Sequence, residues 1–301
     1  MDFSLWPNAS RSWQEVLEGA EYAERTGWFG VWMADHFMLN GDDLSVPINE
    51  CLALLAGLAV KTERVRIGSM VLGNTYRHPA VVANQAATLD QMSGGRFVLG
   101  IGAGWQVNEH RAYGIELPPV RELLARFEEA CQVFKGLLTQ ERTTFDGKYY
   151  QLQDAPLEPK PAKLPILIGA SGEKVALGIV AKYADEWNHW GLPEVAVQKG
   201  EAFARHCEKI GRDPKTVRRS SQAQIAIVVP GDTEAEETRA RLLASGRMPV
   251  IMGSAEEVLD TVARYPEAGI DEFLVPDGNL GSGTRRFDAL ERLREEVFNK
   301  L

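Results

Sequence analysis

The feature that most constrains the fold of this chain is a repeated alternation of short apolar segments with longer amphipathic segments. Eight segments have the apolar or β-branched composition of strands, and residues with helical spacing lie between them. The expected strands cover residues 3–6, 29–33, 65–72, 97–101, 166–168, 185–190, 222–229 and 273–275. The alternation predicts an α/β fold, and eight strands separated by helices indicate a closed (β/α)8 TIM barrel. An open, doubly wound sheet is the alternative, because the number of strands does not show whether the sheet closes.

Capping signals place the ends of several expected helices. Ser12 and Glu15 have the spacing of a capping box, which recurs at Thr233 and at Ser254. Pro79 suits the first residue of a helix. The expected helices cover residues 13–26, 48–60, 79–92, 120–139, 173–183 and 284–298, with one more ending near 210 and two starting near 233 and 254.

The segment 140–165 interrupts this pattern. It contains the turn signal Asp146-Gly147 and several prolines, so it is expected to leave the strand–helix alternation. The chain shows no fixed-period repeat and no low-complexity linker. We therefore expect residues 1–301 to form a single barrel domain with an insertion around 140–165.

Composition narrows the classes of partner. The formal net charge is -9 with no basic run, which argues against binding to a nucleic acid backbone. The longest apolar stretch, residues 52–60, is too short to span a membrane, and the first residues lack the pattern of a signal peptide. The three cysteines form no CxxC pair and suit a reducing compartment. These observations favour a cytoplasmic protein with a small-molecule substrate.

In a parallel barrel the chemistry belongs at the carboxyl ends of the strands, where Asp35 and His36 follow the second expected strand. An imidazole there could donate a proton to a substrate oxygen or accept one from it. Asp35 could orient the imidazole or cap a backbone amide. The alternative interpretation is a capping aspartate beside an exposed histidine.

Two glycine-rich turns follow other expected strands. The segment Gly100–Trp105 fails the dinucleotide fingerprint, because Trp105 replaces its last glycine. Its glycines could let a flat ligand lie against the backbone, with the amide of Asn108 reading a ring edge; the alternative is an ordinary turn. Gly169-Ala170-Ser171-Gly172 precedes an expected helix and could form an anion site. The alternative there is a tight turn with Ser171 as the N-cap.

Metal and nucleophile signatures are lacking in the sequence. The five histidines form no H-x-H or HExxH pair, so we expect no metal site. No G-x-S-x-G segment is present, which leaves an esterase nucleophile without support.

Taken together, these segments resemble the luciferase-like monooxygenase superfamily, and more closely its branch that uses the deazaflavin coenzyme F420. The resemblance covers residues 1 to about 275. It is carried by WMADHF at 32–37, GSMV at 68–71, RHP at 77–79, TLDQMSGGR at 88–96, GIGAGWQVNE at 100–109, PKP at 159–161, PILIG at 165–169 and YADEWN at 183–188. The order of these motifs is highly specific for the superfamily and only moderately specific for the cofactor.

The resemblance implies a barrel with insertions, usually dimeric, in which a tricyclic ring lies across the carboxyl-terminal mouth. It implies that the strand-three bulge, often a non-prolyl cis peptide, falls at Met70-Val71 behind the ring. Asp35 and His36 would face the hydride-transfer side. The remaining implied contacts to the cofactor are Trp105, Asn108, Asn188 and, toward a phosphate, Gly169, Ala170, Ser171 and Gly172.

One position departs from a branch of the superfamily. Its sugar-phosphate dehydrogenases have a carboxylate after the last glycine of the fourth-strand loop, where this chain has Trp105. The departure disfavours a sugar phosphate as substrate and favours a more apolar or planar compound.

The resulting hypothesis is an F420-dependent oxidoreductase, expected as a homodimer, with His36 as the proton donor or acceptor paired with Asp35. An FMN-dependent monooxygenase that uses reduced flavin and oxygen is the nearest alternative. A non-catalytic flavin-binding protein is another. A phosphate-binding barrel lyase or isomerase would need a lysine or a carboxylate pair at the strand ends, and the expected strand ends offer neither.

Overall fold

The computed structural model describes residues 1–41, 43 and 45–301. Its barrel strands are β1 (Asp2–Trp6), β2 (Gly30–Met33), β3 (Arg66–Ser69), β5 (Phe97–Gly102), β8 (Ile166–Gly169), β9 (Glu186–Trp190), β10 (Arg218–Gln222) and β13 (Glu272–Pro276). Neighbouring strands run parallel in the order β3, β2, β1, β13, β10, β9, β8, β5, and pairing of β5 with β3 closes the ring. The predicted TIM barrel is therefore confirmed, and the open sheet is excluded.

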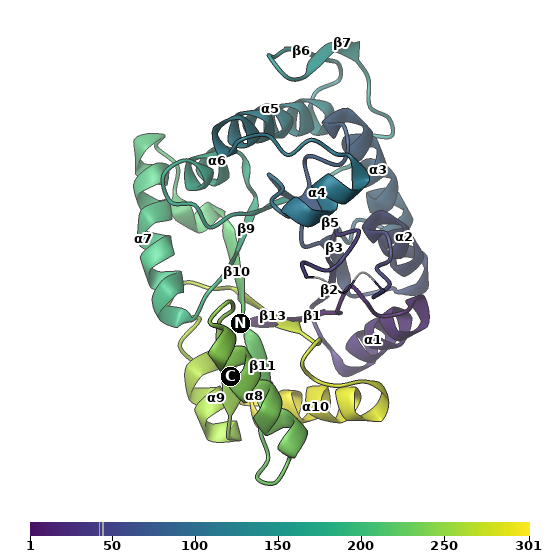
Figure 1. Ribbon diagram of the computed structural model, residues 1–301. Coiled ribbons are helices and arrows are strands. Elements are labelled where there is room, and N and C mark those ends of the chain that lie inside the picture. The colour runs from purple at the N-terminus through teal and green to yellow at the C-terminus, as the bar shows by residue number, and fades with distance from the viewer. Residues whose placement is uncertain (42, 44) are drawn as a thin grey trace.

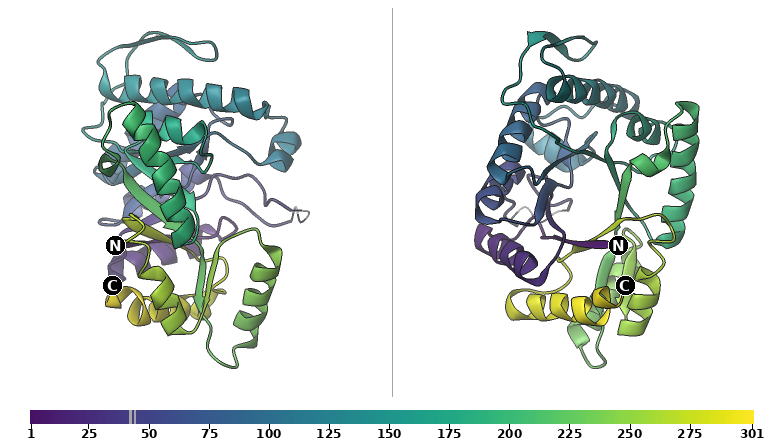
Figure 2. Two further views of the ribbon diagram at one scale, coloured as in Figure 1. Left: turned by 90° about the vertical axis from the view of Figure 1, so that its left-hand side faces the viewer. Right: turned by 180° about the vertical axis from the view of Figure 1, so that it is seen from behind.

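Helices surround the strands, as Figure 1 and the rear view in Figure 2 show. They are α1 (Trp13–Thr26), α2 (Cys51–Lys61), α3 (Pro79–Ser93), α4 (Val107–Tyr113), α5 (Val120–Thr139), α6 (Ala176–Tyr183), α7 (Pro193–Lys209), α8 (Thr233–Ser245), α9 (Ala255–Val262) and α10 (Gly283–Glu296), with short 3-10 turns at Pro214–Thr216 and Phe298–Lys300. None of the helices in the described part of the chain is long and apolar enough to cross a membrane.

Local sequence signals account for several helix ends. Ser12 and Glu15 form the predicted capping box at the start of α1, and Gly27 ends that helix with a φ of 80°. Ser254 caps α9 in the same way. At α8 the N-cap is Asp232 rather than Thr233, because the Asp232 carboxylate accepts the Ala235 amide. Helix α6 begins at Ala176, three residues later than expected.

The seventh barrel strand differs from the prediction. The apolar segment expected to supply it contains β11 (Gln224–Ile227), which pairs with β12 (Val250–Gly253) in a separate two-stranded sheet. The barrel strand is β10, with the sequence RRSSQ. Its last three side chains, Ser220, Ser221 and Gln222, are buried although they are polar, so the strand leaves no apolar signal in the sequence. Ser221, for example, is buried and donates to the His189 carbonyl.

The third expected strand is interrupted where the resemblance implied a bulge. Strand β3 ends at Ser69, a short strand β4 (Leu72–Gly73) follows, and the Met70–Val71 peptide bond between them is cis. The Met70 amide donates to the Met33 carbonyl, which anchors the interruption to β2.

The segment 140–165 leaves the barrel, as its turn signals predict. It contains β6 (Thr143–Asp146) and β7 (Gln151–Ala155), which pair antiparallel. Figure 2 shows this hairpin extending beyond α5. Its turn is held by Glu129 of α5, whose carboxylate accepts the amides of Lys148 and Tyr149 at 2.9 and 2.8 Å.

The amino-terminal end of the barrel is filled by a buried polar cluster. Glu272 accepts hydrogen bonds from Ser4 Oγ at 2.6 Å and from Trp32 Nε1 at 2.9 Å. Burial raises the pKa of Glu272, while the nearby Arg66 and Arg218 guanidinium groups oppose that rise. This end of the barrel is closed, so the open end lies at the carboxyl ends of the strands.

Candidate active site

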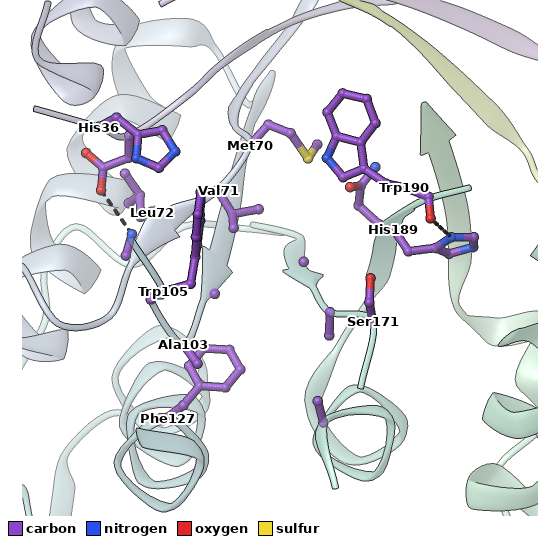
Figure 3. A pocket seen from close by; sticks show the side chains of 18 of the residues that line it. His36, Met70, Val71, Leu72, Ala103, Trp105, Phe127, Ser171, His189 and Trp190 are labelled. Atoms are coloured by element: carbon purple, nitrogen blue, oxygen red, sulfur yellow. Dashed lines mark hydrogen bonds between the residues drawn. The ribbon is translucent and has the colours of Figure 1, made fainter. Parts of the chain in front are cut away.

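A cavity of about 570 Å³ lies at the carboxyl ends of the barrel strands. This size suits a cofactor or drug-sized ligand. Figure 3 shows His36 and Trp105 on one side of Val71, with His189 and Trp190 on the other. The mouth of the barrel is therefore where the predicted site residues gather.

His36 is held by a residue that the sequence did not single out. Its Nδ1 lies 2.9 Å from Oε1 of Glu109, which is on α4 and fully buried. The other Glu109 oxygen accepts the Phe37 amide at 2.8 Å, and the Tyr76 hydroxyl donates to Oε1. Helix α4 thus positions a carboxylate that fixes the orientation of the His36 ring.

The same hydrogen bonds set the charge of the carboxylate. Burial by itself raises the pKa of Glu109, but the hydrogen bonds from His36, Tyr76 and the Phe37 amide outweigh it and lower that pKa below its ordinary value. Glu109 is therefore ionised at neutral pH and accepts a hydrogen bond from His36 Nδ1–H. This leaves His36 Nε2 as the ring nitrogen available to a substrate.

The predicted pairing of His36 with Asp35 is wrong. Both Asp35 oxygens bind the Arg77 guanidinium, at 2.8 and 2.9 Å, and one of them also accepts the Gly73 amide at 3.0 Å. Asp35 and His36 therefore have separate partners, Arg77 and Glu109. Asp35 still borders the cavity, where its carboxylate joins the end of β2 to the loop after β4.

The Val71 side chain packs against two glycines, Gly102 and Gly169. A Cβ added at Gly102 would lie 2.8 Å from Val71 Cγ2, and one added at Gly169 would lie 3.0 Å from it. Any larger residue at these positions would displace Val71. All three residues line the cavity, together with Met70, so part of the wall combines bare backbone with a branched apolar side chain.

The other glycines in and after these strands are required for different reasons. A Cβ at Gly100 would lie 1.8 Å from the Ser69 carbonyl oxygen, so this glycine permits the close approach of β3 and β5. At Gly68 the space that a Cβ would need is filled by the Trp32 ring. Gly104 has a φ of 96°, which favours glycine. Of the glycines expected to accommodate a flat ligand, Gly102 and Gly104 line the cavity, and Gly102 makes room for Val71.

The turn after β8 does not form the expected helix start. Ala170 and Ser171 line the cavity, but Ser171 caps no helix because α6 begins five residues later. The Ser171 carbonyl accepts Lys199 Nζ at 2.7 Å, and the Ala170 carbonyl accepts Trp187 Nε1 at 2.9 Å. The turn therefore contributes a hydroxyl and an ammonium group at its edge.

Asn188 lies in the cavity wall and is bound to a second amide. Its Nδ2 donates to Gln222 Oε1 at 2.7 Å, and Gln222 Nε2 donates back to Asn188 Oδ1 at 3.1 Å. Trp105 also lines the cavity, is 59% exposed and meets the His36 ring edge-on at 5.7 Å.

Two predicted site residues lie outside the cavity lining. Asn108 donates to the Leu39 carbonyl at 2.8 Å and accepts the Glu109 amide, so its side chain braces the start of α4. Gly172 lies beyond Ser171 and does not line the cavity either. The expectation that the Asn108 amide faces the cavity is therefore wrong for the described cavity.

Several lining residues were missed by sequence reasoning. Trp190 ends β9, which was assigned correctly, so the strand-end rule could have found it; Gln222 ends β10 and was missed because that strand was misassigned. Tyr76 gives no signal, because its contact with Glu109 depends on tertiary folding. Within the described residues no group of three His, Cys, Asp or Glu side chains could hold a metal ion.

A family model described as luciferase-like monooxygenase matches residues 1–250. The chain belongs to the luciferase-like monooxygenase family. The predicted family is thereby confirmed, and the named relatives fall in its F420-dependent branch.

Relatives of this luciferase-like chain include F420-dependent glucose-6-phosphate dehydrogenases. That of Microbacterium testaceum is 34% identical over 235 residues, covering 75% of this chain and 68% of the relative. That of Kineococcus radiotolerans is 42% identical over 164 residues, covering 54% and 48%. That of Amycolatopsis mediterranei is 37% identical, with 57% and 50% covered. The chain thus spans about half the length of several curated relatives that it matches.

Solved structures share the luciferase-like fold. An F420-dependent secondary alcohol dehydrogenase in complex with an F420-acetone adduct has a TM-score of 0.85 at 23% identity, with 98% of each chain covered. A coenzyme F420-dependent tetrahydromethanopterin reductase from Methanopyrus kandleri has a TM-score of 0.80 at 19% identity, with 99% of each covered. These likenesses support the barrel assignment.

Proposed function

We propose that this chain is an F420-dependent oxidoreductase that transfers a hydride between a small organic substrate and the deazaflavin coenzyme. The observation that carries the proposal is the His36–Glu109 hydrogen bond at the mouth of a barrel that has a cavity of about 570 Å³. The relatives named F420-dependent dehydrogenases favour F420 over the FMN-dependent alternative.

The residues of the cavity fit a flat coenzyme. Val71, Gly102 and Gly169 line one part of the cavity, where the absence of side chains at the two glycines leaves room for Val71. Ser171 and the Lys199 ammonium at its carbonyl suit the anionic side chain of the coenzyme. When bound, the deazaflavin ring supplies the two-electron hydride chemistry.

His36 moves the proton in this proposal. Its Nε2 accepts the hydroxyl proton when an alcohol is oxidised to a carbonyl compound, and returns it in the reverse direction. Glu109 holds Nδ1 and stabilises the imidazolium that forms. Asp35 acts differently, because its carboxylate is occupied by Arg77 and the Gly73 amide and positions the segment that carries His36.

Apolar side chains keep the reacting groups away from water. Leu72, Leu124 and Phe127 line the cavity, and Trp105 stands at its edge beside His36. A cavity with such walls strengthens the electrostatic interaction between His36 and Glu109.

The organisation of the protein is part of the proposal. We infer that residues 1–301 act as one barrel domain with an insertion around 140–165, and that the chain works as a cytoplasmic homodimer. The three cysteines, Cys51, Cys131 and Cys207, are buried and unpaired, which suits a reducing compartment. Sedimentation equilibrium tests the dimer, and a single mass of one chain would overturn it.

The experiment is a turnover assay that follows the absorbance of F420 with a panel of alcohols, and of reduced F420 with the matching carbonyl compounds. We expect F420-dependent turnover in at least one direction. Substrate-dependent oxygen consumption with reduced FMN, without any turnover of F420, would assign the chain to the monooxygenase alternative. Turnover unchanged in His36→Ala would remove His36 from the reaction and favour a binding protein.

A further inference from the structure

We infer that the substrate of this site is an uncharged alcohol or carbonyl compound with an apolar body, and not a phosphorylated sugar. The inference rests on the proposed function and adds the substrate class to it. The names of the relatives would suggest a sugar phosphate. The composition of the cavity wall indicates an uncharged substrate instead.

The cavity wall offers no cation to a phosphate. Among the described residues that line the cavity, none is a lysine or an arginine, and the one carboxylate is Asp35. A phosphate monoester carries about 1.5 to 2 negative charges at neutral pH. A buried charge of that size needs paired cations, which this wall does not provide.

Arg77 and Lys199, which bind the lining residues Asp35 and Ser171, are already engaged. Arg77 binds Asp35 through both terminal nitrogens of its guanidinium and also binds Glu50 at 2.6 Å. Lys199 donates to the Ser171 carbonyl at 2.7 Å and lies 3.6 Å from Glu173. In the proposed function Lys199 serves the anionic side chain of the coenzyme, and Arg77 is held by two carboxylates, so neither cation is left for a substrate phosphate.

Arg247 is the cation to test as a partner for a substrate phosphate. It precedes Met248, which lines the cavity, and its side chain is exposed. It is exposed and adjacent in sequence to a lining residue, and Asp35 is the only carboxylate among the described residues that line the cavity. The experiment therefore includes a variant of this residue.

The inner part of the wall is aromatic and apolar. The Trp6 and Trp190 rings lie 5.4 Å apart at an angle of 46°, at the ends of β1 and β9. Met70 and Met248 also face the cavity, and methionine adapts its shape to apolar ligands. These four side chains can surround the hydrocarbon body of a substrate.

The amides of the wall are satisfied by each other. Asn188 and Gln222 exchange two hydrogen bonds, at 2.7 and 3.1 Å, and Asn188 Nδ2 also donates to Ser220 Oγ at 2.9 Å. A ligand phosphate could obtain hydrogen bonds from these two amides only by disrupting the pair. One hydroxyl or carbonyl oxygen, by contrast, needs only His36 Nε2.

The first test compares a matched pair of ligands. Glucose and glucose-6-phosphate are titrated into the protein with F420 present and absent, with tryptophan fluorescence as the readout because Trp6 and Trp190 face the cavity. We expect the phosphate group to leave binding unchanged or to weaken it. Binding of the phosphate at least about tenfold tighter than the unphosphorylated sugar would overturn the inference.

The second test compares turnover of F420 with cyclohexanol, 2-propanol and glucose-6-phosphate. We expect a higher kcat/KM for at least one uncharged alcohol than for the sugar phosphate. A higher kcat/KM for the sugar phosphate, lost in Arg247→Gln, would overturn the inference and identify the missing cation. That result would leave the proposed function intact.

A charge placed at the wall gives the third test. Met248 is 37% exposed, so a lysine can be accommodated there, and Met248→Gln is the uncharged control of similar length. We expect Met248→Lys to bind glucose-6-phosphate about tenfold tighter than Met248→Gln does. If both variants bind glucose-6-phosphate equally and the unmodified protein binds it tightly, then the protein already neutralises the phosphate. That result would overturn the inference. Failure of F420 to bind would refute the proposed function, and the cofactor-free titration would still decide the charge preference.

Discussion

The Nδ1 atom of His36 lies 2.9 Å from Oε1 of Glu109, although the two residues are 73 positions apart in the chain. The bond joins the loop after β2 to helix α4, and both residues border or support the same cavity. It fixes which nitrogen of His36 faces the substrate. The variants below test this relationship and its surroundings.

Glu109→Gln should lower kcat by about 10²–10⁴-fold, the range for loss of general acid–base catalysis. The amide keeps the shape of the side chain but carries no charge to hold Nδ1–H or to stabilise the imidazolium. Steady-state kinetics with F420 measures the effect. Glu116→Gln is the control, because that carboxylate is exposed and pairs with Arg126. An unchanged kcat in Glu109→Gln would show that Glu109 does not act through His36.

Asp35→Asn should lower the free energy of unfolding by about 3 kcal/mol, the lower end of the range for breaking a buried ion pair. The lower end applies because Arg77 retains Glu50. Chemical denaturation measures the loss, and a double-mutant cycle with Arg77→Met isolates the pair. Asp154→Asn is the control, since the Arg142–Asp154 pair is exposed and should contribute little. Equal effects of the two aspartate changes would contradict the structure.

Gly100→Ala should lower the free energy of unfolding by at least the upper end of the about 1–3 kcal/mol typical of overpacking. The new Cβ would lie 1.8 Å from the Ser69 carbonyl oxygen, so β3 and β5 must separate. Gly172→Ala is the matched control, because its Cβ would meet only Ala176 Cβ at 3.5 Å. That control should stay within about 0.5 kcal/mol of the parent. Similar unfolding curves for both variants would refute the close approach of the strands.

His189 should make the protein less stable as the pH falls from 6.5 toward 4. Burial lowers the pKa of His189 from 6.5 to about 4, although its bond to the Trp190 carbonyl partly opposes the shift. Between these values the unfolded chain binds one more proton than the folded chain, so the free energy of unfolding falls by about 1.4 kcal/mol per pH unit. The contribution is fully present above pH 6.5. His189→Gln should remove this slope, and an unchanged slope in denaturation experiments would show that His189 titrates normally.

The barrel was predictable because the strand–helix alternation repeats throughout the chain. The error at the seventh strand arose because β10 buries serine and glutamine side chains, whereas the apolar β11 lies in a separate sheet. Hydrophobic periodicity detects strands whose burial is apolar, so it chose β11. The short helix α4 was also missed, since seven residues give little periodicity.

The sequence predicted several of the residues that line the site, but not which of them form hydrogen bonds with each other. His36, Val71 and Ser171 all line the cavity, as the strand-end rule implies for a barrel. The partners of Asp35 and His36 come from residues 42 and 73 positions away. Such contacts depend on how the loop after β4 and helix α4 fold over the mouth, which a single sequence does not encode as a local pattern.

The central claim is that the barrel mouth binds F420. An equilibrium titration of the purified protein with F420 and, in parallel, with FMN tests it most directly. The account predicts one F420 bound per chain, with a Kd at least about tenfold below that for FMN. Binding of FMN with no binding of F420 would contradict it.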